Sequence, residues 1–337
     1  MNIIDVNTFN QIIKQFDPSK KILVIGDVGV DKYTQGEVVR ISPEAPVPVV
    51  EVTKEWKKLG LAANISHNLT TLNVDSLILG VIGDDSNASV FETLLEDNQL
   101  KTWGIVRDNS RPTIFKERIT TSTQQICRID YENSSPIDKT VEKNLSSKFS
   151  DFIDDYQAVI IEDYSKGTLS DLFIQELIKK CNEKNILVSV DPGKQTSPHV
   201  YTGATLLKPN LVEAKKMVKF LGHAYQKMSL EEIGDTLQKE LNIKYLVITL
   251  GKDGMALWDG KNICKKIPTL ADEVFDVSGA GDTSISLLTL SLICNASLEE
   301  AAWVANCGAG VVVAKKGTAT VNKDELLRFY KRLTNNL

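Results

Sequence analysis

Short runs of apolar and β-branched residues alternate with amphipathic stretches along most of this 337-residue chain. The run KILVIG at 21–26 is followed by LAANISHNLTTL at 61–72, which has helical spacing, and then by SLILGVIG at 76–83. Alternation of this kind is typical of βαβ units. Further strand candidates are QAVIIED at 157–163, NILVSVD at 185–191, ATLLKPN at 204–210 and KYLVITLG at 244–251. The pattern predicts an α/β fold in which helices flank an open, mostly parallel sheet.

Two regions interrupt this alternation, VPVVEVTKEW at 47–56 and TIFKERITTSTQQICRIDYE at 113–132. Their polar and apolar residues alternate, as in strands with one covered and one solvent-facing side. We expect a small β lid formed by segments near 36–56 and 111–132, within a single domain that covers residues 1–337. Because an exposed lid edge can pair with a second copy, we also expect a homodimer through the lid.

Composition and charge exclude several classes of partner. The net charge is −5 and Lys and Arg are scattered, so the chain has no basic stripe for nucleic acid. No apolar run approaches the roughly 20 residues of a membrane span, and the N-terminus has no secretion-signal pattern. The five cysteines include no Cys-x-x-Cys pair, which favours reduced, mostly buried thiols. We therefore expect a cytoplasmic protein that binds neither nucleic acid nor membranes.

The stretch DVSGAGDTS at 276–284 places small residues and one acid immediately before an apolar helical run. In a first helical turn, Gly279, Ala280 and Gly281 would let an anion approach the unpaired backbone N–H groups. A transferring phosphoryl group fits there, and Asp282 could accept the proton of the attacking hydroxyl. The alternative is an ordinary helix start with glycines in a tight turn. The chain contains neither a P-loop motif nor the dinucleotide-binding glycine pattern.

Other polar residues have two interpretations each. Asn210 and Glu213 lie three apart at a predicted helix start, where they could help to hold Mg²⁺ or form a capping box. Lys116 and Arg118 lie two apart on a predicted strand, so they share a face that could contact a sugar phosphate or solvent. The same choice applies to Arg128. Asp163 with Lys166 could contact the sugar or its phosphate, or form a surface ion pair.

The chain resembles the PfkB-type, or ribokinase-like, carbohydrate kinases. The resemblance spans nearly the whole sequence and rests on motifs in the family's order. They are GDVGVD at 26–31, KPNLVE at 208–213, TLGKDG at 249–254, DVSGAGDT at 276–283 and ANCGAGVVVAKKGT at 305–318. The resemblance implies an ATP- and Mg²⁺-dependent sugar kinase.

Within this family, three segments resemble the kinase domain of ADP-heptose synthesis, RISPEAPVPVV at 40–50, QQICRIDYE at 124–132 and EDYSKG at 162–167. This implies phosphorylation of D-glycero-β-D-manno-heptose 7-phosphate at O1. Many such relatives carry an adenylyltransferase domain after the kinase, and we expect none in this sequence. The alternatives are a PfkB-type kinase of another sugar or sugar phosphate, and a catalytically weak sugar-binding relative.

Positions that match the family's motifs imply the following roles. Asp282 is the general base, and the amides of Gly279, Ala280 and Gly281 form the anion hole. The nucleotide side comprises Lys208, Asn210, Leu211, Val212, Glu213, Thr249, Gly251, Gly254 and Asn306, with Glu213 also helping to organise Mg²⁺. The sugar side comprises Asp31, Gly60 and Asn64. The candidates Lys116, Arg118, Arg128, Asp163 and Lys166 are added to this side from the residue pattern described above and not from the family's motifs.

One position departs from the family pattern. In LGLAAN at 59–64, relatives usually have glycine where this chain has Leu61. The spacing of Leu61, Ile65, Leu69 and Leu72 favours a single apolar helix stripe with ordinary helical angles at Leu61. The alternative is a pocket that Leu61 makes narrower.

Overall fold

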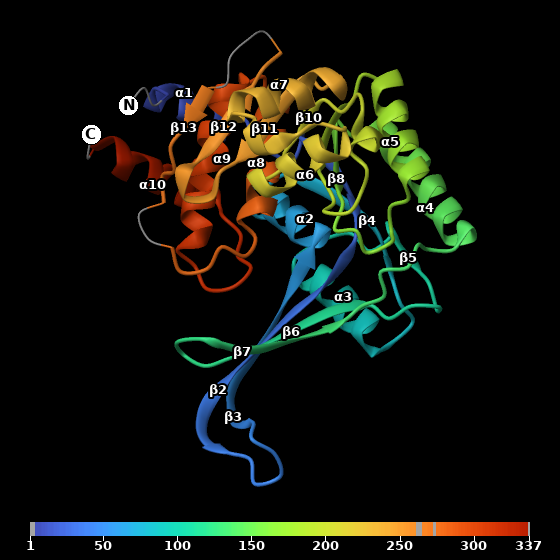
Figure 1. The fold of residues 1–337 in the computed structure, drawn as a ribbon, viewed down its shortest axis with the longest axis vertical. Coiled ribbons are helices and arrows are strands. Elements are labelled where there is room, and N and C mark those ends of the chain that lie inside the picture. The colour runs from blue at the N-terminus through green and yellow to red at the C-terminus, as the bar shows by residue number, and fades with distance from the viewer. Residues whose placement is uncertain (1–3, 261–264, 272–273, 336–337) are drawn as a thin grey trace.

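The fold is seen in a computed structural model, which describes residues 4–260, 265–271 and 274–335. Within these residues a nine-stranded sheet forms the centre of the body (Figure 1). In spatial order its strands are β13 (Lys265–Ile267), β12 (Met255–Trp258), β11 (Tyr245–Thr249), β10 (Leu206–Leu207), β9 (Leu187–Asp191), β8 (Ala158–Glu162), β1 (Lys21–Gly26), β4 (Asp75–Ile82) and β5 (Ile105–Arg107). Neighbouring strands from β11 to β5 are parallel, so the predicted α/β fold is confirmed.

Helices cover both faces of this sheet. One face carries α1 (Val6–Lys14), α2 (Ala62–Thr71), α3 (Ser86–Asp97), α8 (Ala280–Ile293), α9 (Leu298–Val313) and α10 (Lys323–Asn335). The other carries α4 (Lys139–Phe152), α5 (Asp171–Glu183), α6 (Leu211–Phe220) and α7 (Leu230–Glu240). Short 3-10 turns lie at Ile153–Asp155, Pro198–Tyr201, Tyr225–Lys227 and Gly251–Asp253. The alternation along β1 explains both layers, because Ile22 and Val24 pack into one core while Leu23 and Ile25 pack into the other.

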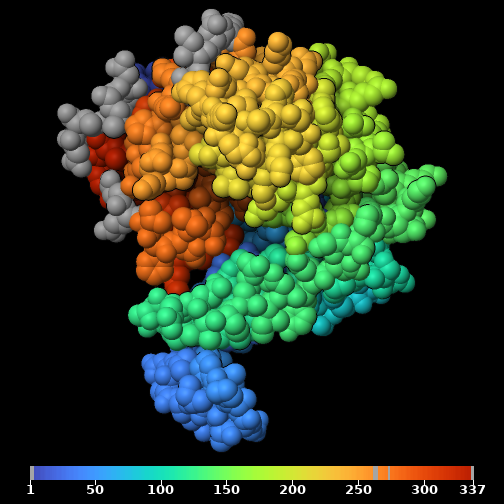
Figure 2. Space-filling view, viewed as in Figure 1, coloured from blue at the N-terminus to red at the C-terminus, as the bar shows by residue number. Residues whose placement is uncertain are grey.

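A separate four-stranded sheet projects from the body. Its order is β3 (Pro48–Leu61), β2 (Val28–Ile41), β6 (Ile114–Thr120) and β7 (Gln125–Tyr131). The β2–β3 hairpin extends away from the body, and a recess separates the β6–β7 strands from the body (Figures 1 and 2). We call this sheet the lid. The lid strand that comes first in the sequence, β2, begins at Val28, earlier than expected. Only Asp27 separates it from β1.

Two parts of the central sheet differ from the expectation. Strands β12 and β13 pair antiparallel beside β11, and the sequence did not predict either. The strand expected within 204–210 is reduced to Leu206–Leu207, since Pro209 lies two residues further on and lacks a backbone N–H. Within the described ranges, no helix has the length and apolar character needed to cross a bilayer. Cys181, Cys294 and Cys307 are buried free thiols and Cys127 is an exposed one, while Cys264 falls outside the described residues.

The expectation for Leu61 is wrong. Leu61 precedes α2 and has φ 58° and ψ −140°, a region that glycine occupies far more readily than leucine. Ile65, Leu69 and Leu72 are fully buried in the core beside α8, as the apolar stripe predicted. The stripe therefore begins after Leu61, whose side chain is buried while its backbone is strained.

Candidate active site

Acidic and basic side chains gather where the central strands end. Glu162 and Asp191 are the last residues of β8 and β9, and Lys208 follows β10. The ammonium Nζ of Lys208 lies 2.6 Å from Asp191 Oδ2, and both side chains are largely buried. Burial raises the pKa of Asp191 to about 6, against the opposing charge of Lys208. This cluster lies at the carboxyl edge of a parallel sheet, where ligands of such folds bind.

The start of α8 faces the same edge. Gly279 is the N-cap of α8 and has φ 83°. Because glycine has no side chain, no capping group from this residue accepts from the first backbone amides of the helix. A Cβ on Gly279 would lie 3.1 Å from Asn64 Nδ2, whereas one on Gly281 would lie 3.7 Å from Lys208 Nζ. Position 279 thus requires glycine for two reasons, the positive φ and the close approach of the Asn64 side chain. Glycine at 281 instead leaves space between the amides, Lys208 and Asp191.

Asp282 lies in the first turn of α8 and is almost fully buried. Asn64 Nδ2 donates to its Oδ2 at 2.7 Å, and the Tyr164 hydroxyl donates to its Oδ1 at 3.0 Å. Burial raises the pKa of Asp282, while these two hydrogen bonds and the charge of Lys208 lower it. Hydrogen bonds therefore place the carboxylate beside the helix start, and among the described residues it has no direct ion pair, an arrangement that suits a proton acceptor.

Sequence reasoning missed Tyr164 and Glu162. Both belong to the EDYSKG segment, from which only Asp163 and Lys166 were selected. Glu162 is buried, and its Oε2 has no hydrogen-bond partner among the described groups. Burial, followed by the charges of Asp191 and Asp282, raises the pKa of Glu162 well above its usual value. Its position at the end of a buried apolar strand was the available signal.

A cavity of about 290 Å³ lies beside the start of α8. It is lined by Thr249, Gly251, Lys252, Gly254, Met255, Thr269, Ala271, Val274, Val277, Ala280, Gly281, Ser284, Asn306, Ala309, Gly310 and Val313. Several residues assigned to the nucleotide from sequence are therefore in one wall. Asn306 donates to the carbonyl of Pro268 at 2.6 Å, which fixes its amide.

The Asn210–Glu213 pair forms a capping box at α6. Asn210 Oδ1 accepts from the Glu213 N–H and Glu213 Oε2 accepts from the Asn210 N–H, each at 2.9 Å. A β-bridge between Asn210 and Thr249 joins this helix start to the cavity wall. Leu211 packs on the core and Val212 is exposed. The capping interpretation is confirmed, and the roles of these residues toward nucleotide and Mg²⁺ stay predictions.

The lid side of the site centres on Asp31 of β2. Arg118 Nη1 lies 2.5 Å from Asp31 Oδ1, and the Thr318 hydroxyl donates to Asp31 Oδ2 at 2.9 Å. A Cβ on Gly60 would lie 3.0 Å from Asp31 Oδ2, so glycine makes room for this carboxylate. Arg118 also stacks on the ring of Tyr33. Asp31 on the lid and Asn64 on α2 thus both act on Asp282, Asp31 through its charge and Asn64 through a hydrogen bond.

The other cations expected on the sugar side, Lys116, Lys166 and Arg128, are paired with acids. Glu132 binds both Lys116, at 2.6 Å, and Lys166. Arg128 pairs with Asp130 at 2.8 Å.

Asp163 does not pair with Lys166, which corrects that alternative. Its carboxylate accepts from the hydroxyls of Tyr201 and Thr196, at 2.7 and 2.6 Å, because it turns toward the core beneath the segment. Its role toward the sugar stays a prediction.

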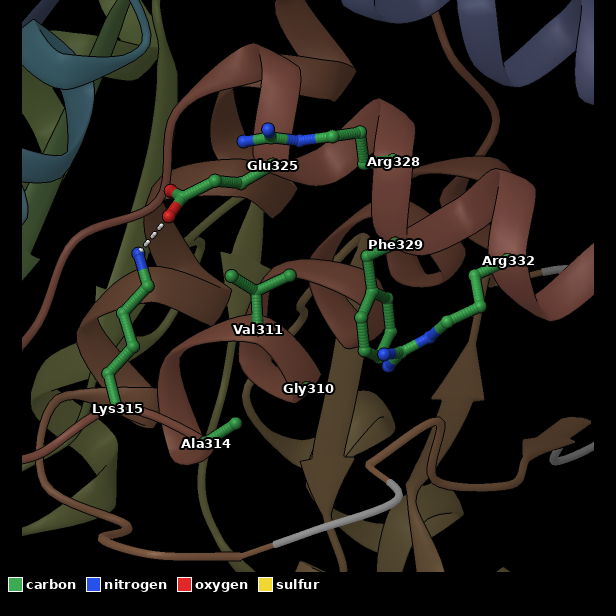
Figure 3. Close-up of a pocket in the computed structure, with 8 residues that line it drawn as sticks. All are labelled: Gly310, Val311, Ala314, Lys315, Glu325, Arg328, Phe329 and Arg332. Atoms are coloured by element: carbon green, nitrogen blue, oxygen red, sulfur yellow. Dashed lines mark ion pairs between the residues drawn. The ribbon is translucent and has the colours of Figure 1, made fainter.

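A larger cavity of about 380 Å³ lies between α9 and α10, where Lys315 pairs with Glu325 (Figure 3). It shares Gly310 with the cavity beside the start of α8 but contains none of the acids around Asp282. Among the residues with assigned positions, no group of three or more His, Cys, Asp and Glu could hold a metal by itself.

Comparisons with known proteins agree with this geometry. The profile of the pfkB family carbohydrate kinases matches residues 19–325. The bifunctional protein HldE of Sulfurimonas denitrificans is 40% identical over 316 residues, which cover 94% of this chain and 65% of that protein. HldE of Helicobacter pylori strain J99 is 41% identical over 310 residues, covering 91% of this chain and 65% of that protein. The chain thus spans about two thirds of the length of these relatives.

Solved structures show the same fold. A ribokinase from Arabidopsis thaliana complexed with ribose and ATP has a TM-score of 0.71 at 18% identity, over 93% of this chain and 99% of that one. Phosphofructokinase-2 from Escherichia coli in complex with fructose-6-phosphate has a TM-score of 0.73 at 17% identity, over 94% and 99%. At such identities the likeness concerns the fold alone. The family match over residues 19–325, on a ribokinase-like fold, shows that the chain belongs to the pfkB family of carbohydrate kinases.

Proposed function

We propose that this chain transfers the γ-phosphoryl group of ATP to O1 of D-glycero-β-D-manno-heptose 7-phosphate, giving the 1,7-bisphosphate. The observation that carries this proposal is the place of Asp282. A buried carboxylate stands between a helix start suited to phosphate and a lid that carries several cations. The two HldE relatives and the heptose-kinase resemblance of EDYSKG and its companion segments support the choice of sugar.

The chemistry follows from the residues around Asp282. A sugar hydroxyl bound beside Asp31 and Asn64 would give its proton to the Asp282 carboxylate as its oxygen attacks the γ-phosphorus. The amides at the start of α8 would stabilise the charge on the transferring group, and Lys208 would add a cation beside them. ATP would occupy the cavity lined by Thr249 and Asn306.

Mg²⁺ fits the donor set of this site. Asn210 and Glu213 offer oxygen donors, and Mg²⁺ commonly uses one or two carboxylates together with water and substrate phosphates. Glu213 is the residue that would hold it, since its second carboxylate oxygen, Oε1, lies outside the capping-box bond. When bound, Mg²⁺ would spread the charge of the ATP phosphates.

The lid supports a substrate that already bears a phosphate. Lys116 and Lys166 both pair with Glu132, and Lys116 also lies 3.6 Å from Asp130, so an incoming phosphate could replace or join these carboxylates. The neighbouring pair of Arg128 and Asp130 adds a further exposed cation. An unphosphorylated sugar would leave these cations unused.

A substrate panel tests the proposal. The protein, ATP and Mg²⁺ would be incubated with heptose 7-phosphate, its epimers, fructose 6-phosphate, ribose and fructose, and the phosphate position read by ³¹P NMR. We expect the highest kcat/KM for heptose 7-phosphate and a new phosphate on O1. Higher kcat/KM for another sugar would make the chain a different pfkB-family kinase, and turnover of none would favour a sugar-binding relative.

The end of the β2–β3 hairpin supports a homodimer through the lid. Val39, Ile41, Val47 and Val52 are exposed there, and strand edges with apolar side chains favour association. Light scattering at micromolar concentration should give a dimer, and Val39→Lys should weaken it. Leu172→Lys, which changes a more exposed leucine on α5, away from the lid, is the control. A monomeric wild-type protein with full activity would contradict this proposal.

A further inference from the structure

Both carboxylate oxygens of Asp282 already accept a hydrogen bond within the protein. Tyr164 reaches Oδ1 from the turn after β8, and Asn64 reaches Oδ2 from α2. These partners come from separate elements on either side of α8, so together they fix the rotation of the carboxylate. Each carboxylate oxygen has more than one lone pair, so an oxygen held in this way can still accept from a substrate hydroxyl.

The turn that carries Tyr164 is itself anchored by a buried acid. Asp27 Oδ2 accepts from the N–H groups of Tyr164 and Lys166, at 3.1 and 3.0 Å, and Asp27 Oδ1 accepts from the Thr168 N–H at 3.1 Å. Asp27 is 1% exposed and joins the central sheet to the lid. The position of the Tyr164 hydroxyl therefore depends on the body of the protein, and a ligand is not needed to create it.

We propose that Tyr164 is a positioning residue, whose hydroxyl orients the Asp282 carboxylate and favours its ionised form. This inference rests on the proposed role of Asp282 as the base. The Tyr164 hydroxyl is suited to donate a hydrogen bond while keeping its proton, because burial and the adjacent Asp282 charge raise the pKa of Tyr164 well above its usual value. A merely structural tyrosine would instead fill space through its ring, and its hydroxyl could be removed without effect on Asp282.

Other charges also act on Asp282, and they determine how much the phenol matters. Lys208, after β10, favours the carboxylate, whereas Asp31 on β2, Glu162 on β8 and Asp191 on β9 oppose it. A neutral donor is therefore one of few groups that stabilise the ionised base. The base must be ionised to accept a proton, so activity falls as pH decreases through the pKa of Asp282. Loss of the phenol would raise that pKa and move the acid limb to higher pH.

The first test is Tyr164→Phe, which keeps the ring and removes the hydroxyl. We expect kcat to fall about ten-fold or more, as for a misplaced catalytic group, with KM for the sugar changed less than about three-fold. The acid limb of the kcat profile should move up by about one pH unit, the scale of one hydrogen bond to a charged group. Substitution of Tyr164 by 3-fluorotyrosine, which has nearly the same shape and is a stronger hydrogen-bond donor, should move the acid limb to lower pH.

Tyr201→Phe is the matched control, because the Tyr201 hydroxyl donates to another buried carboxylate, Asp163, at 2.7 Å. It should leave the acid limb in place. An acid limb that is unchanged in Tyr164→Phe, or shifted equally in Tyr201→Phe, would overturn the proposal.

A second readout needs no substrate. With ¹³C-labelled aspartate carboxyls, and the Asp282 signal assigned by its loss in Asp282→Asn, the titration midpoint of Asp282 should rise by about one pH unit in Tyr164→Phe. This result would stand even if the wild-type protein phosphorylated no sugar of the panel, which would overturn only the proposed function. An unchanged midpoint would overturn the role of Tyr164 whatever the substrate.

Discussion

The two sides of the site are held in different ways. Around Asp282 the contacts are hydrogen bonds from the neutral groups of Asn64 and Tyr164, in a nearly dry environment. In the lid, the cations Lys116 and Arg128 are paired with acids in more exposed surroundings. Neutral bonds to a buried acid keep a reactive group in place before substrate arrives, whereas ion pairs near water can exchange partners at small cost. The difference suggests a preassembled base beside an exchangeable binding surface.

The largest effect is expected on the body side of this comparison. Asp282→Asn should lower kcat by about 100-fold or more, the usual scale for loss of a general base, because the amide cannot accept the proton. ATP affinity should change little, since the α8 amides and the cavity remain. Steady-state kinetics and nucleotide titration measure both quantities. Near-normal turnover by a folded Asp282→Asn protein would show that Asp282 is not the base.

A smaller effect is expected on the lid side, where Arg128 and Arg118 should differ. Arg128→Gln should raise KM for a phosphorylated sugar by roughly three- to ten-fold and leave its unphosphorylated analogue unchanged, because one exposed charged contact is lost. Arg118→Gln should raise KM for both, because it leaves Asp31 without its cation. Lys179→Gln, on the exposed face of α5, controls for net charge. Equal losses for both sugars in Arg128→Gln would assign Arg128 to structure alone.

The smallest effect concerns the backbone that joins lid to body. Inside a helix, a glycine variant is less stable than the alanine variant by about 1 kcal/mol. At the positive φ of Leu61 we expect the glycine variant to be the more stable one, by a similar amount. Urea unfolding of Leu61→Gly and Leu61→Ala gives this difference in the free energy of unfolding. The pair Ile65→Gly and Ile65→Ala, inside α2, should keep the ordinary order. Greater stability of Leu61→Ala would restore the helical-stripe interpretation.

Sequence patterns predicted the features that depend on local order. Strands β1, β4, β8, β9 and β11 and the start of α8 lie close to the predicted positions, because apolar periodicity and small residues are read within a few residues. The pairing of side chains was not predictable in this way. Asn64 and Asp282 are 218 residues apart, and Lys166 and Glu132 come from different elements. The fold alone brings such residues together.

Leu61 and Tyr164 show two further limits. The spacing of Leu61 fits a helix, but the close joining of β3 to α2 imposes a backbone angle that periodicity does not encode. Tyr164 carries no motif of its own, because its function would depend on a single hydroxyl whose direction is set by Asp27.

The most direct test of the account is the ratio of kcat/KM for heptose 7-phosphate to that for the same heptose without its phosphate. If the body supplies the base and the lid supplies the phosphate contacts, the wild-type protein should prefer the phosphorylated sugar by about 100-fold or more, the scale of two charge-assisted contacts. Both sugars should be phosphorylated on O1, since the base is the same. Equal kcat/KM values for the two sugars would contradict the division of roles between lid and body.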